Sequence, residues 1–263
     1  MRGTVIAAID LGPSSPRVLY HAAGFARLLS CELEILHVNG TSAESRAKVL
    51  DYCRHQGSYE IDLEDKDVVV ASGLVSEIIL RESIREQAQL VVVGSRGRGG
   101  LAKLILGSTS DAVLRAATVP VLVVPPTDLD IVNITDRATL TCGPVLAAVD
   151  LAEHCDHQLE LAAGLATQSG QRLLMMTVAP ARMTEHAAAV MLRQRAHQLN
   201  GTKPQAMIVR RGDVADEISR CALSEGSGLV VMGLRARPRG TPGAIASAVL
   251  KTNRAFVLGV PGC

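Results

Sequence analysis

The chain has 263 residues, of which 48% are hydrophobic, 20% are charged and only 2% are aromatic. Its 27 Lys and Arg residues nearly balance 26 Asp and Glu residues, so the formal net charge is +1 and offers no broad attraction to phosphate backbones or acidic lipids. The length indicates two modules of about 130 residues. No apolar run reaches the ~20 residues of a bilayer-spanning helix, and the few aromatic rings exclude nucleic-acid binding by base stacking.

The first predicted element is a buried strand in the opening sequence MRGTVIAAIDLG, which has a short apolar run ending at Asp10 and no secretory cleavage site. The six cysteines are dispersed and form no C-x-x-C pair, which favours small core side chains in a reducing compartment. We therefore expect a cytoplasmic protein that has neither a membrane nor a nucleic acid as partner.

Short β-branched runs alternate with segments of helical period along the whole chain, which predicts α/β domains with parallel sheets and helices on both faces. The predicted elements of the first half are strands near Thr4 to Ile9, Glu32 to Val38, Asp67 to Ala71, Leu90 to Val93 and Val121 to Val124, with helices such as Arg17 to Leu29, Leu74 to Ala88 and Ser108 to Ala117. The predicted strands of the second half lie near Pro144 to Val149, Arg172 to Val178, Gln205 to Arg210, Leu229 to Met232 and Phe256 to Val260.

The two halves are a tandem repeat. VIAAIDL recurs as VLAAVDL, so that Asp10 corresponds to Asp150, and AAGFA recurs as AAGLA after the same spacing. LVVVGSRGR and VLRAATVPVLVV are echoed by LVVMGLRAR and VLKTNRAFVLGV in the same order. Between the halves, Pro125 to Pro144 has prolines near both ends and no helical period. We predict domains at residues 1–125 and 144–263 joined by a linker at 126–143.

A glycine-rich, basic loop after the fourth strand has the features of a phosphate site. Gly94, Gly97 and Gly107 let a backbone approach a ligand closely, and Ser108 to Ser110 begin the next helix. The unpaired N–H groups and the dipole of a helix N-terminus attract anions. A tight solvent loop followed by a serine cap remains the alternative.

The first and fourth strands lead to a common crevice, because ligands of open parallel sheets lie at the carboxyl ends of the strands where the strand order reverses. Asp10 ends the first strand and Gly94 ends the fourth. A carboxylate suits an adenine amino group or a ribose hydroxyl better than a phosphate, so a nucleotide could span the two strand ends.

These residues resemble the universal stress protein family. The spacing of Gly94, Gly97, Gly107 and Ser108 is similar to that family's ATP-binding motif, and VVVGSRGRGGLAKLILGSTSDAVLRAATVPVLVV is similar to its C-terminal block. The resemblance also includes Asp10 and the His37-Val38 pair, and it implies two tandem Rossmann-like domains of the adenine nucleotide alpha hydrolase-like type. Each would have a five-stranded parallel sheet of order 3-2-1-4-5.

Carried over by position, the resemblance implies that Ala8, Asp10 and Val38 flank an adenine. The nucleotide loop would begin at Val93 and Gly94, and the ribose and phosphates would contact Gly97, Gly107, Ser108, Thr109 and Ser110. Arg96, Arg98 and Lys103 are candidate screening charges. In the second half, Ala236 and Gly243-Ala244 replace the matching glycine and Gly-Ser pair, so we expect that domain to bind ATP poorly. Its arginines at 235, 237 and 239 are either a solvated loop or a site for another anion.

Other chemistry has little support in the sequence. His154, Cys155, Asp156 and His157 read as a polar helix start rather than a zinc site, because a structural zinc needs ligands from a second segment. No nucleophile elbow, zincin helix or lysine-bearing phosphate loop occurs. We predict no catalytic and no metal residues, with slow ATP hydrolysis involving Asp10 as the most that the chain supports.

The sequence thus predicts a cytoplasmic stress-response protein that binds ATP or AMP, with or without Mg²⁺, through its first domain and acts as a regulator or sensor. The alternatives are a protein that binds a non-nucleotide ligand or a partner, and a weak ATPase. The apolar last strands of the two halves predict an internal pseudo-dimer in which these strands are adjacent, and a further homodimer remains open.

Overall fold

The computed structural model describes residues 3–39, 43–55, 63–95, 106–134, 138–199, 202–234, 244–252 and 255–262. The chain divides into two compact units. The first comprises Met1–Asp128 with Ile134–Ala138, and the second comprises Leu129–Asn133 with Thr139–Cys263.

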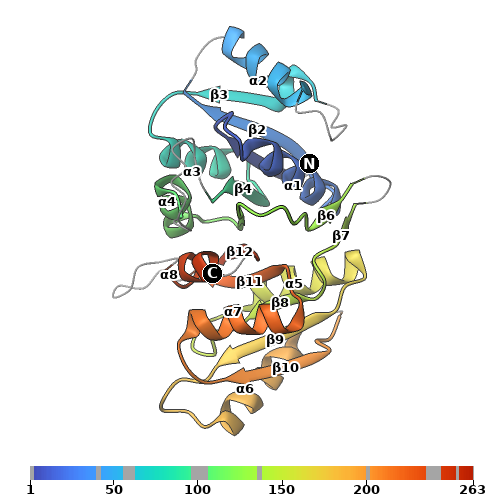
Figure 1. Cartoon of the computed structure of the whole chain (residues 1–263), viewed down its shortest axis with the longest axis vertical. Helices are drawn as coiled ribbons and strands as arrows, with labels where there is room; N and C mark the ends of the chain where they lie inside the picture. The colour runs from blue at the N-terminus through green and yellow to red at the C-terminus, as the bar shows by residue number, and fades with distance from the viewer. Residues whose placement is uncertain are drawn as a thin grey trace. The chain divides into compact units, whose positions relative to one another are not determined.

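The first unit is a doubly wound α/β domain (Figure 1). Its elements are β1 (Thr4–Ile9), α1 (Ser15–Leu28), β2 (Glu32–Val38), α2 (Ala43–His55), the one-turn helix η1 (Asp65–Asp67), β3 (Val68–Ala71), α3 (Val75–Arg85), β4 (Leu90–Gly94), α4 (Ser108–Ala116) and β5 (Val121–Val124). Its strands are parallel in the order β3-β2-β1-β4-β5. Because such crossovers are right-handed, α1 and α2 cover one face of the sheet and α3 and α4 cover the other.

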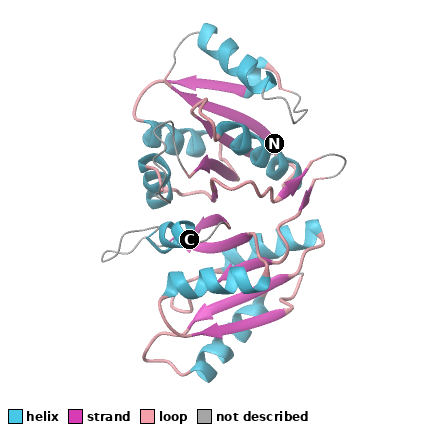
Figure 2. Ribbon diagram, in the orientation of Figure 1, coloured by secondary structure: helices cyan, strands magenta, loops and turns pink. Residues whose placement is uncertain are grey.

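The second unit repeats this architecture (Figure 2). Its elements are β8 (Val145–Ala148), α5 (Asp156–Ser169), β9 (Leu173–Val178), α6 (Glu185–Gln198), β10 (Ala206–Arg210), α7 (Val214–Glu225), β11 (Leu229–Leu234), α8 (Ala244–Thr252) and β12 (Phe256–Pro261). Its parallel strands follow the order β10-β9-β8-β11-β12. The predicted fold class, with the order 3-2-1-4-5 in each half, is confirmed.

The sequence signals for the elements are local and plain. Central strands such as β4 and β8 are apolar runs buried on both faces, as parallel sheets covered by helices require. Helix α7 begins where the Asp213 carboxylate accepts hydrogen bonds from the N–H groups of Ala215 and Asp216, at 3.0 and 3.1 Å. It ends at Gly226, whose φ of 66° is the left-handed conformation that glycine adopts readily.

The structure also differs from the predicted elements. Helix α3 ends at Arg85 rather than Ala88, because Gln87 takes a left-handed φ of 48° and turns the chain toward β4. The segment predicted as the linker contains a short antiparallel pair, β6 (Val132–Asn133) with β7 (Thr139–Leu140). Two-residue strands lie below the length at which alternation of apolar residues is detectable.

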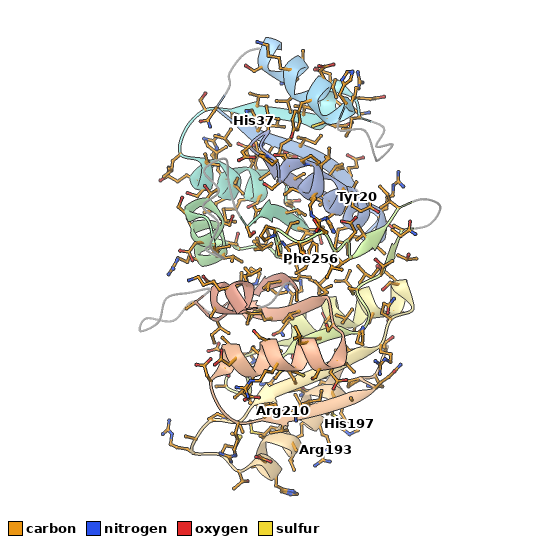
Figure 3. All side chains as sticks on the ribbon, viewed as in Figure 1. Tyr20, His37, Arg193, His197, Arg210 and Phe256 are labelled. Carbon is orange, nitrogen blue, oxygen red and sulfur yellow. The ribbon has the colours of Figure 1, made fainter. Side chains whose placement is uncertain are left out.

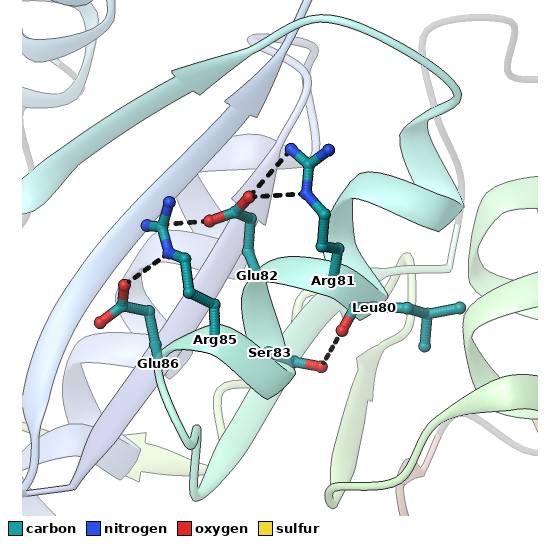
Figure 4. A network of polar contacts seen from close by, with 6 residues as sticks. All are labelled: Leu80, Arg81, Glu82, Ser83, Arg85 and Glu86. Carbon is teal, nitrogen blue, oxygen red and sulfur yellow. Dashed lines mark hydrogen bonds and ion pairs between the residues drawn. The ribbon is translucent and has the colours of Figure 1, made fainter.

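A network of charged side chains surrounds a buried carboxylate on α3 (Figure 4). The Glu82 side chain is only 2% exposed and forms ion pairs with Arg81 and Arg85, at 3.0 and 2.8 Å. Arg85 also donates a hydrogen bond from Nε to Glu86 at 2.9 Å. Burial, together with the nearby carboxylates of Glu86 and Glu82, raises the pKa of Glu34 on β2 to about 7, although Arg85 opposes the rise.

Glu34 is expected to make the stability of the protein depend on pH. Because its folded-state pKa of about 7 lies above the ordinary value of 4.5, its protonated form favours folding. That contribution is fully present below the ordinary value and is lost as the pH rises through about 7. After allowance for its partial exposure, the loss is on the order of 1 kcal/mol. Chemical unfolding of Glu34→Gln should show a flatter pH dependence than the parent chain, and parallel profiles would contradict the assignment.

The described cysteines are mostly core residues, as predicted. Cys53, Cys142, Cys155 and Cys221 are buried, and Cys31 is partly exposed. Burial raises the pKa of Cys53 and of Cys142 to about 12, so these thiols stay protonated and unreactive near neutral pH. Cys263 lies outside the described residues.

Within the described residues, no helix is both long enough and apolar enough to cross a membrane.

Candidate functional site

The candidate site of the first unit lies at the carboxyl ends of β1, β2 and β4. Ala8 on β1 is paired with Leu36 on β2 and with Val93 on β4. Strand β1 is the point where the chain's path across the sheet reverses, since β2 and β3 lie to one side of it and β4 and β5 to the other. A crevice at such a reversal is where open α/β sheets bind ligands. Of the predicted site residues, Ala8, Asp10, Val38, Val93 and Gly94 therefore come together.

Asp10 is held by the turn that follows β1. Its Oδ1 atom accepts hydrogen bonds from the Gly12 N–H at 2.8 Å and from the Ser15 hydroxyl at 3.0 Å. Leu11 between them has a φ of 60°, which is uncommon for a residue with a Cβ. Within the described part of the chain, the second oxygen, Oδ2, has no hydrogen-bond partner. The turn thus fixes the carboxylate and leaves one acceptor for a ligand.

His37 is a structural link at the same edge of the sheet (Figure 3). Its ring is buried, and Nδ1 lies 3.0 Å from the carbonyl oxygen of Ile9. Because a carbonyl can only accept, Nδ1 carries the proton in this contact. The Tyr52 hydroxyl on α2 donates to the Gly12 carbonyl at 3.1 Å. These two contacts fasten the end of β1 to β2 and to α2.

Helix α4 begins next to the end of β4. The Gly107 N–H donates to the Ser95 carbonyl at 2.7 Å, which closes the loop between β4 and α4. The hydroxyl of Ser110, which is 4% exposed, donates to the Gly94 carbonyl. The first intrahelical bond runs from the Asp111 N–H to the Gly107 carbonyl at 2.9 Å. Ser108 is exposed and Thr109 is half-buried, so the first turn of α4, which these contacts hold beside the end of β4, is open to solvent.

The other residues predicted for the nucleotide loop fall in a part of the chain that the structure does not describe. Gly97, Arg96, Arg98 and Lys103 lie outside the described residues, as do Ala236 and Gly243 of the second half. Sequence reasoning missed Ser15, which supports Asp10, although a serine five residues after a strand-end aspartate at a helix start was a usable signal. It also missed Tyr52, because nothing in the sequence brings α2 to the turn after β1.

The counterpart of the turn in the second unit keeps its main contact. Asp150 Oδ1 accepts from the Ala152 N–H at 2.9 Å. The polar run beginning at His154 is a helix start, as predicted, because α5 begins at Asp156 with Cys155 as its cap. Across the residues that the structure describes, no three His, Cys, Asp or Glu side chains are gathered as metal ligands.

Together the fold and the site define a doubly wound α/β protein whose candidate site lies at its strand-order reversal. Residues 1–125 match the sequence profile of the universal stress protein family. This part of the chain therefore belongs to the universal stress protein family, and the predicted family is confirmed.

Similar proteins extend this comparison. Universal stress protein Rv2005c of Mycobacterium tuberculosis is 35% identical over 130 residues, which are 45% of this chain and 44% of the relative. The matched part is therefore less than half of that relative's length. Universal stress protein A homolog 1 of Coxiella burnetii is 28% identical over 141 residues, which cover 46% of this chain and 94% of the relative.

The likeness to solved structures concerns the fold. The crystal structure of a universal stress protein from Archaeoglobus fulgidus matches 98% of this chain and 98% of its own, with a TM-score of 0.72 and 20% identity. This match shows that both halves of the chain have the same fold type. Universal stress proteins solved with cAMP and with dAMP match 47% and 45% of the chain, each at a TM-score of 0.37, and these two matches carry no argument about its site.

Proposed function

We propose that the first unit binds ATP or AMP and that the protein acts as a cytoplasmic regulator or sensor rather than as an enzyme. One observation carries the proposal: the start of α4 opens beside the end of β4, at the same sheet edge as the fixed Asp10 carboxylate. An anion site and a nucleoside acceptor at one strand-order reversal match the two ends of a nucleotide.

The phosphates are assigned to the first turn of α4. The N–H of Gly107 is already bonded to Ser95, so the N–H groups of Ser108 and Thr109 are the donors proposed for a phosphate. The Ser110 hydroxyl donates within the fold, which leaves the exposed Ser108 hydroxyl and the Thr109 hydroxyl as further donors. Gly97 and a Mg²⁺ ion belong to the proposal on the family resemblance alone.

The nucleoside is assigned to the ends of β1 and β2. Asp10 Oδ2 is the proposed acceptor for an adenine amino group or a ribose hydroxyl, because Oδ1 is occupied by Gly12 and Ser15. Ala8, Val38 and Val93 are the residues proposed to flank the adenine, as the family resemblance implies. In this assignment the Asp10 carboxylate contacts the nucleoside and not the phosphates, so no repulsion between like charges opposes binding.

The cheapest test is native mass spectrometry of the purified full chain, where a bound adenine nucleotide supports the proposal.

A sharper test uses the three tyrosines, Tyr20, Tyr52 and Tyr59, which all lie in the first half. With ¹³C-labelled tyrosine, the ring signals of Tyr52 report on the turn that holds Asp10. Saturable shifts with ATP or AMP are expected. Absence of both a bound nucleotide and a shift would favour the alternative of a non-nucleotide ligand or a protein partner.

The substitution Ser108→Ala should weaken ATP binding more than adenosine binding. Its hydroxyl is at the proposed phosphate end, where a hydrogen bond to a charged group contributes about 1.5–3 kcal/mol, and adenosine has no phosphate to lose. Titrations monitored through the Tyr52 ring signals measure the affinities of both ligands for the first unit. Equal losses for the two ligands would mean that the phosphates are wrongly assigned.

We also propose that the two domains pair as an internal pseudo-dimer through β5 and β12. Each is the last strand in the order of its own unit, and each is an apolar run that would favour aggregation if it were left unpaired. Hydrogen exchange in the full chain tests the pairing, because the amides of an unpaired edge strand exchange fast.

A further inference from the structure

The outer edge of the second unit's sheet is open. Strand β10 is the last strand in the order of that unit, and no strand of the described residues pairs with its outer side. The Arg210 carbonyl accepts a hydrogen bond from the Ala179 N–H at 2.8 Å, so the main chain of Arg210 faces β9. The main chain of Val209 therefore faces the open side, and among the described residues its carbonyl meets only the guanidinium of Arg210, at 3.5 Å. Such an edge can accept one more strand.

The same edge exposes an apolar side chain whose counterpart in the first unit is buried. Met207 and Val68 hold the same register position in the repeat, since Met207 lies beside Met175 and Val68 beside Ile35. Met207 is 43% exposed, whereas Val68 is 1% exposed. Before β3 the chain forms η1, and the described residues before β10 form no such turn. The open edge of the second unit thus combines main-chain groups with accessible apolar surface.

The segment that contains α6 and β10 is basic. Residues 182–211 contain six Lys and Arg residues and a single acid, Glu185. Glu185 forms an ion pair with Arg211 at 3.3 Å. Arg193 on α6 and Arg210 on β10 are exposed and form no ion pair within the described residues. Helix α6 packs against β10, and both arginines lie in the same part of the second unit (Figure 3).

The corresponding edge of the first unit already has its charges paired. Arg46 on α2 forms an ion pair with Asp65 of η1 at 3.4 Å, and Lys66 forms one with Glu64 at 2.6 Å. An acidic ligand would compete there with carboxylates of the protein itself. The open edge of the second unit is therefore the better site for such a ligand.

An extended peptide makes use of all three features. Its main chain can pair with the open side of β10, its apolar side chains can meet Met207, and its carboxylates can pair with Arg193 and Arg210. Pairing β10 with the β10 of a second copy would bring like charges together, and a nucleic acid has no main chain that can extend a sheet. We propose that β10 binds an extended acidic segment of a partner protein by strand addition.

Met207 allows this edge to be observed in the full chain. With ¹³C-methyl methionine, its signal is assigned by its loss in Met207→Leu. Met175 on β9 and Met232 on β11 are 0% and 4% exposed and report on the integrity of the fold. Of the seven methionines, only Met1 lies in the first half. Binding at β10 is therefore measured separately from nucleotide binding in the first unit.

The probe is a capped peptide of about eight residues that alternates glutamate with valine, which is long enough to pair along β10. It should shift the Met207 signal saturably, and its affinity should fall as the salt concentration rises. A peptide that alternates lysine with valine keeps the strand propensity and reverses the charge. The acidic peptide with N-methylated amides keeps the charge and donates no main-chain hydrogen bond. Each of these two controls should bind at least about tenfold more weakly.

Four results would overturn the proposal. The first is an acidic peptide that leaves the Met207 signal unmoved at millimolar concentration. The second is equal binding of the N-methylated or the lysine peptide, because strand pairing or charge would then play no part. The third is a single-stranded oligothymidylate that moves Met207 at the same or a lower concentration, because the edge would then bind any polyanion. The fourth is a Met207 signal that changes when the chain alone is diluted, which would make a second copy the occupant.

Charge-reversing variants test the two arginines. Arg210→Glu and Arg193→Glu should each weaken the acidic peptide roughly tenfold or more. The matched control is Lys251→Glu on α8, an exposed cation of the same unit on a helix that packs against β12, at the other end of that unit's strand order. Equal losses in Arg210→Glu and Lys251→Glu, with the Met175 and Met232 signals undisturbed, would mean that only net charge matters and would contradict a site at β10.

Discussion

Gly107→Val should abolish ATP binding to the first unit and leave its fold intact. Gly107 has φ −63° and ψ 150°, a conformation open to valine, and its N–H bond to Ser95 does not depend on the side chain. The branched side chain would instead stand at the first turn of α4, where the proposed phosphate has to approach the backbone closely. Titration calorimetry with ATP measures the loss, and circular dichroism checks the fold.

The matched control is Gly243→Val, the parallel change in the second half, which lies outside the described residues. It should hardly change ATP affinity, since the neighbouring serine of the first half is replaced there by Ala244. Equal losses in the two variants would contradict the view that the halves have different ligand preferences. The sequence also predicts that Gly97→Val acts like Gly107→Val.

Asp10→Ala should weaken both ATP and adenosine in the first unit. A hydrogen bond to a charged group contributes about 1.5–3 kcal/mol, which corresponds to roughly a ten- to hundredfold loss of affinity. The substitution also removes the acceptor of the Gly12 N–H and the Ser15 hydroxyl, so the turn after β1 should loosen and thermal stability should fall. Titrations monitored through the Tyr52 ring signals measure the loss of affinity, and thermal unfolding measures the loss of stability separately.

Asp150→Ala is the internal control for this experiment. Asp150 makes the same bond to the N–H two residues ahead, so its loss should cost stability in the same way. It should not change the affinities measured at Tyr52, which belongs to the first unit. If the two variants weakened the Tyr52-detected binding equally, Asp10 would have no direct role and only general stability would matter.

Most of the fold was predictable because its signals are local. Buried parallel strands require unbroken apolar runs, so strands such as β1 and β2 were located with the bounds that the structure has. Because the second half repeats the sequence pattern of the first, the same strand order could be predicted for both halves. The last turn of α3 and the β6–β7 pair were not predictable, because a single left-handed residue and two-residue strands leave no periodic pattern.

The candidate site was predictable in its residue types but not in its contacts. Asp10 at a strand end and the Gly107–Ser108 helix start are visible as spacing along the chain. The sequence did not reveal that Ser95 already accepts the Gly107 N–H, or that Tyr52 reaches the turn after β1. Such partners depend on crossovers that bring distant segments to one edge of the sheet.

The sequence by itself determined the duplication, the alternation of strands and helices, and the family of residues 1–125. Each of these is encoded by neighbouring residues or by recurrence of the same residues. Only the tertiary structure decided which distant segments of the second half are linked by side chains. Gln158 meets the carbonyl of Val231, 73 residues away, because β8 and β11 are neighbours in the sheet although they are remote in the chain. The loss of phosphate-binding residues is readable as sequence, whereas the link that Gln158 makes between β8 and β11 exists only once the strands have assembled.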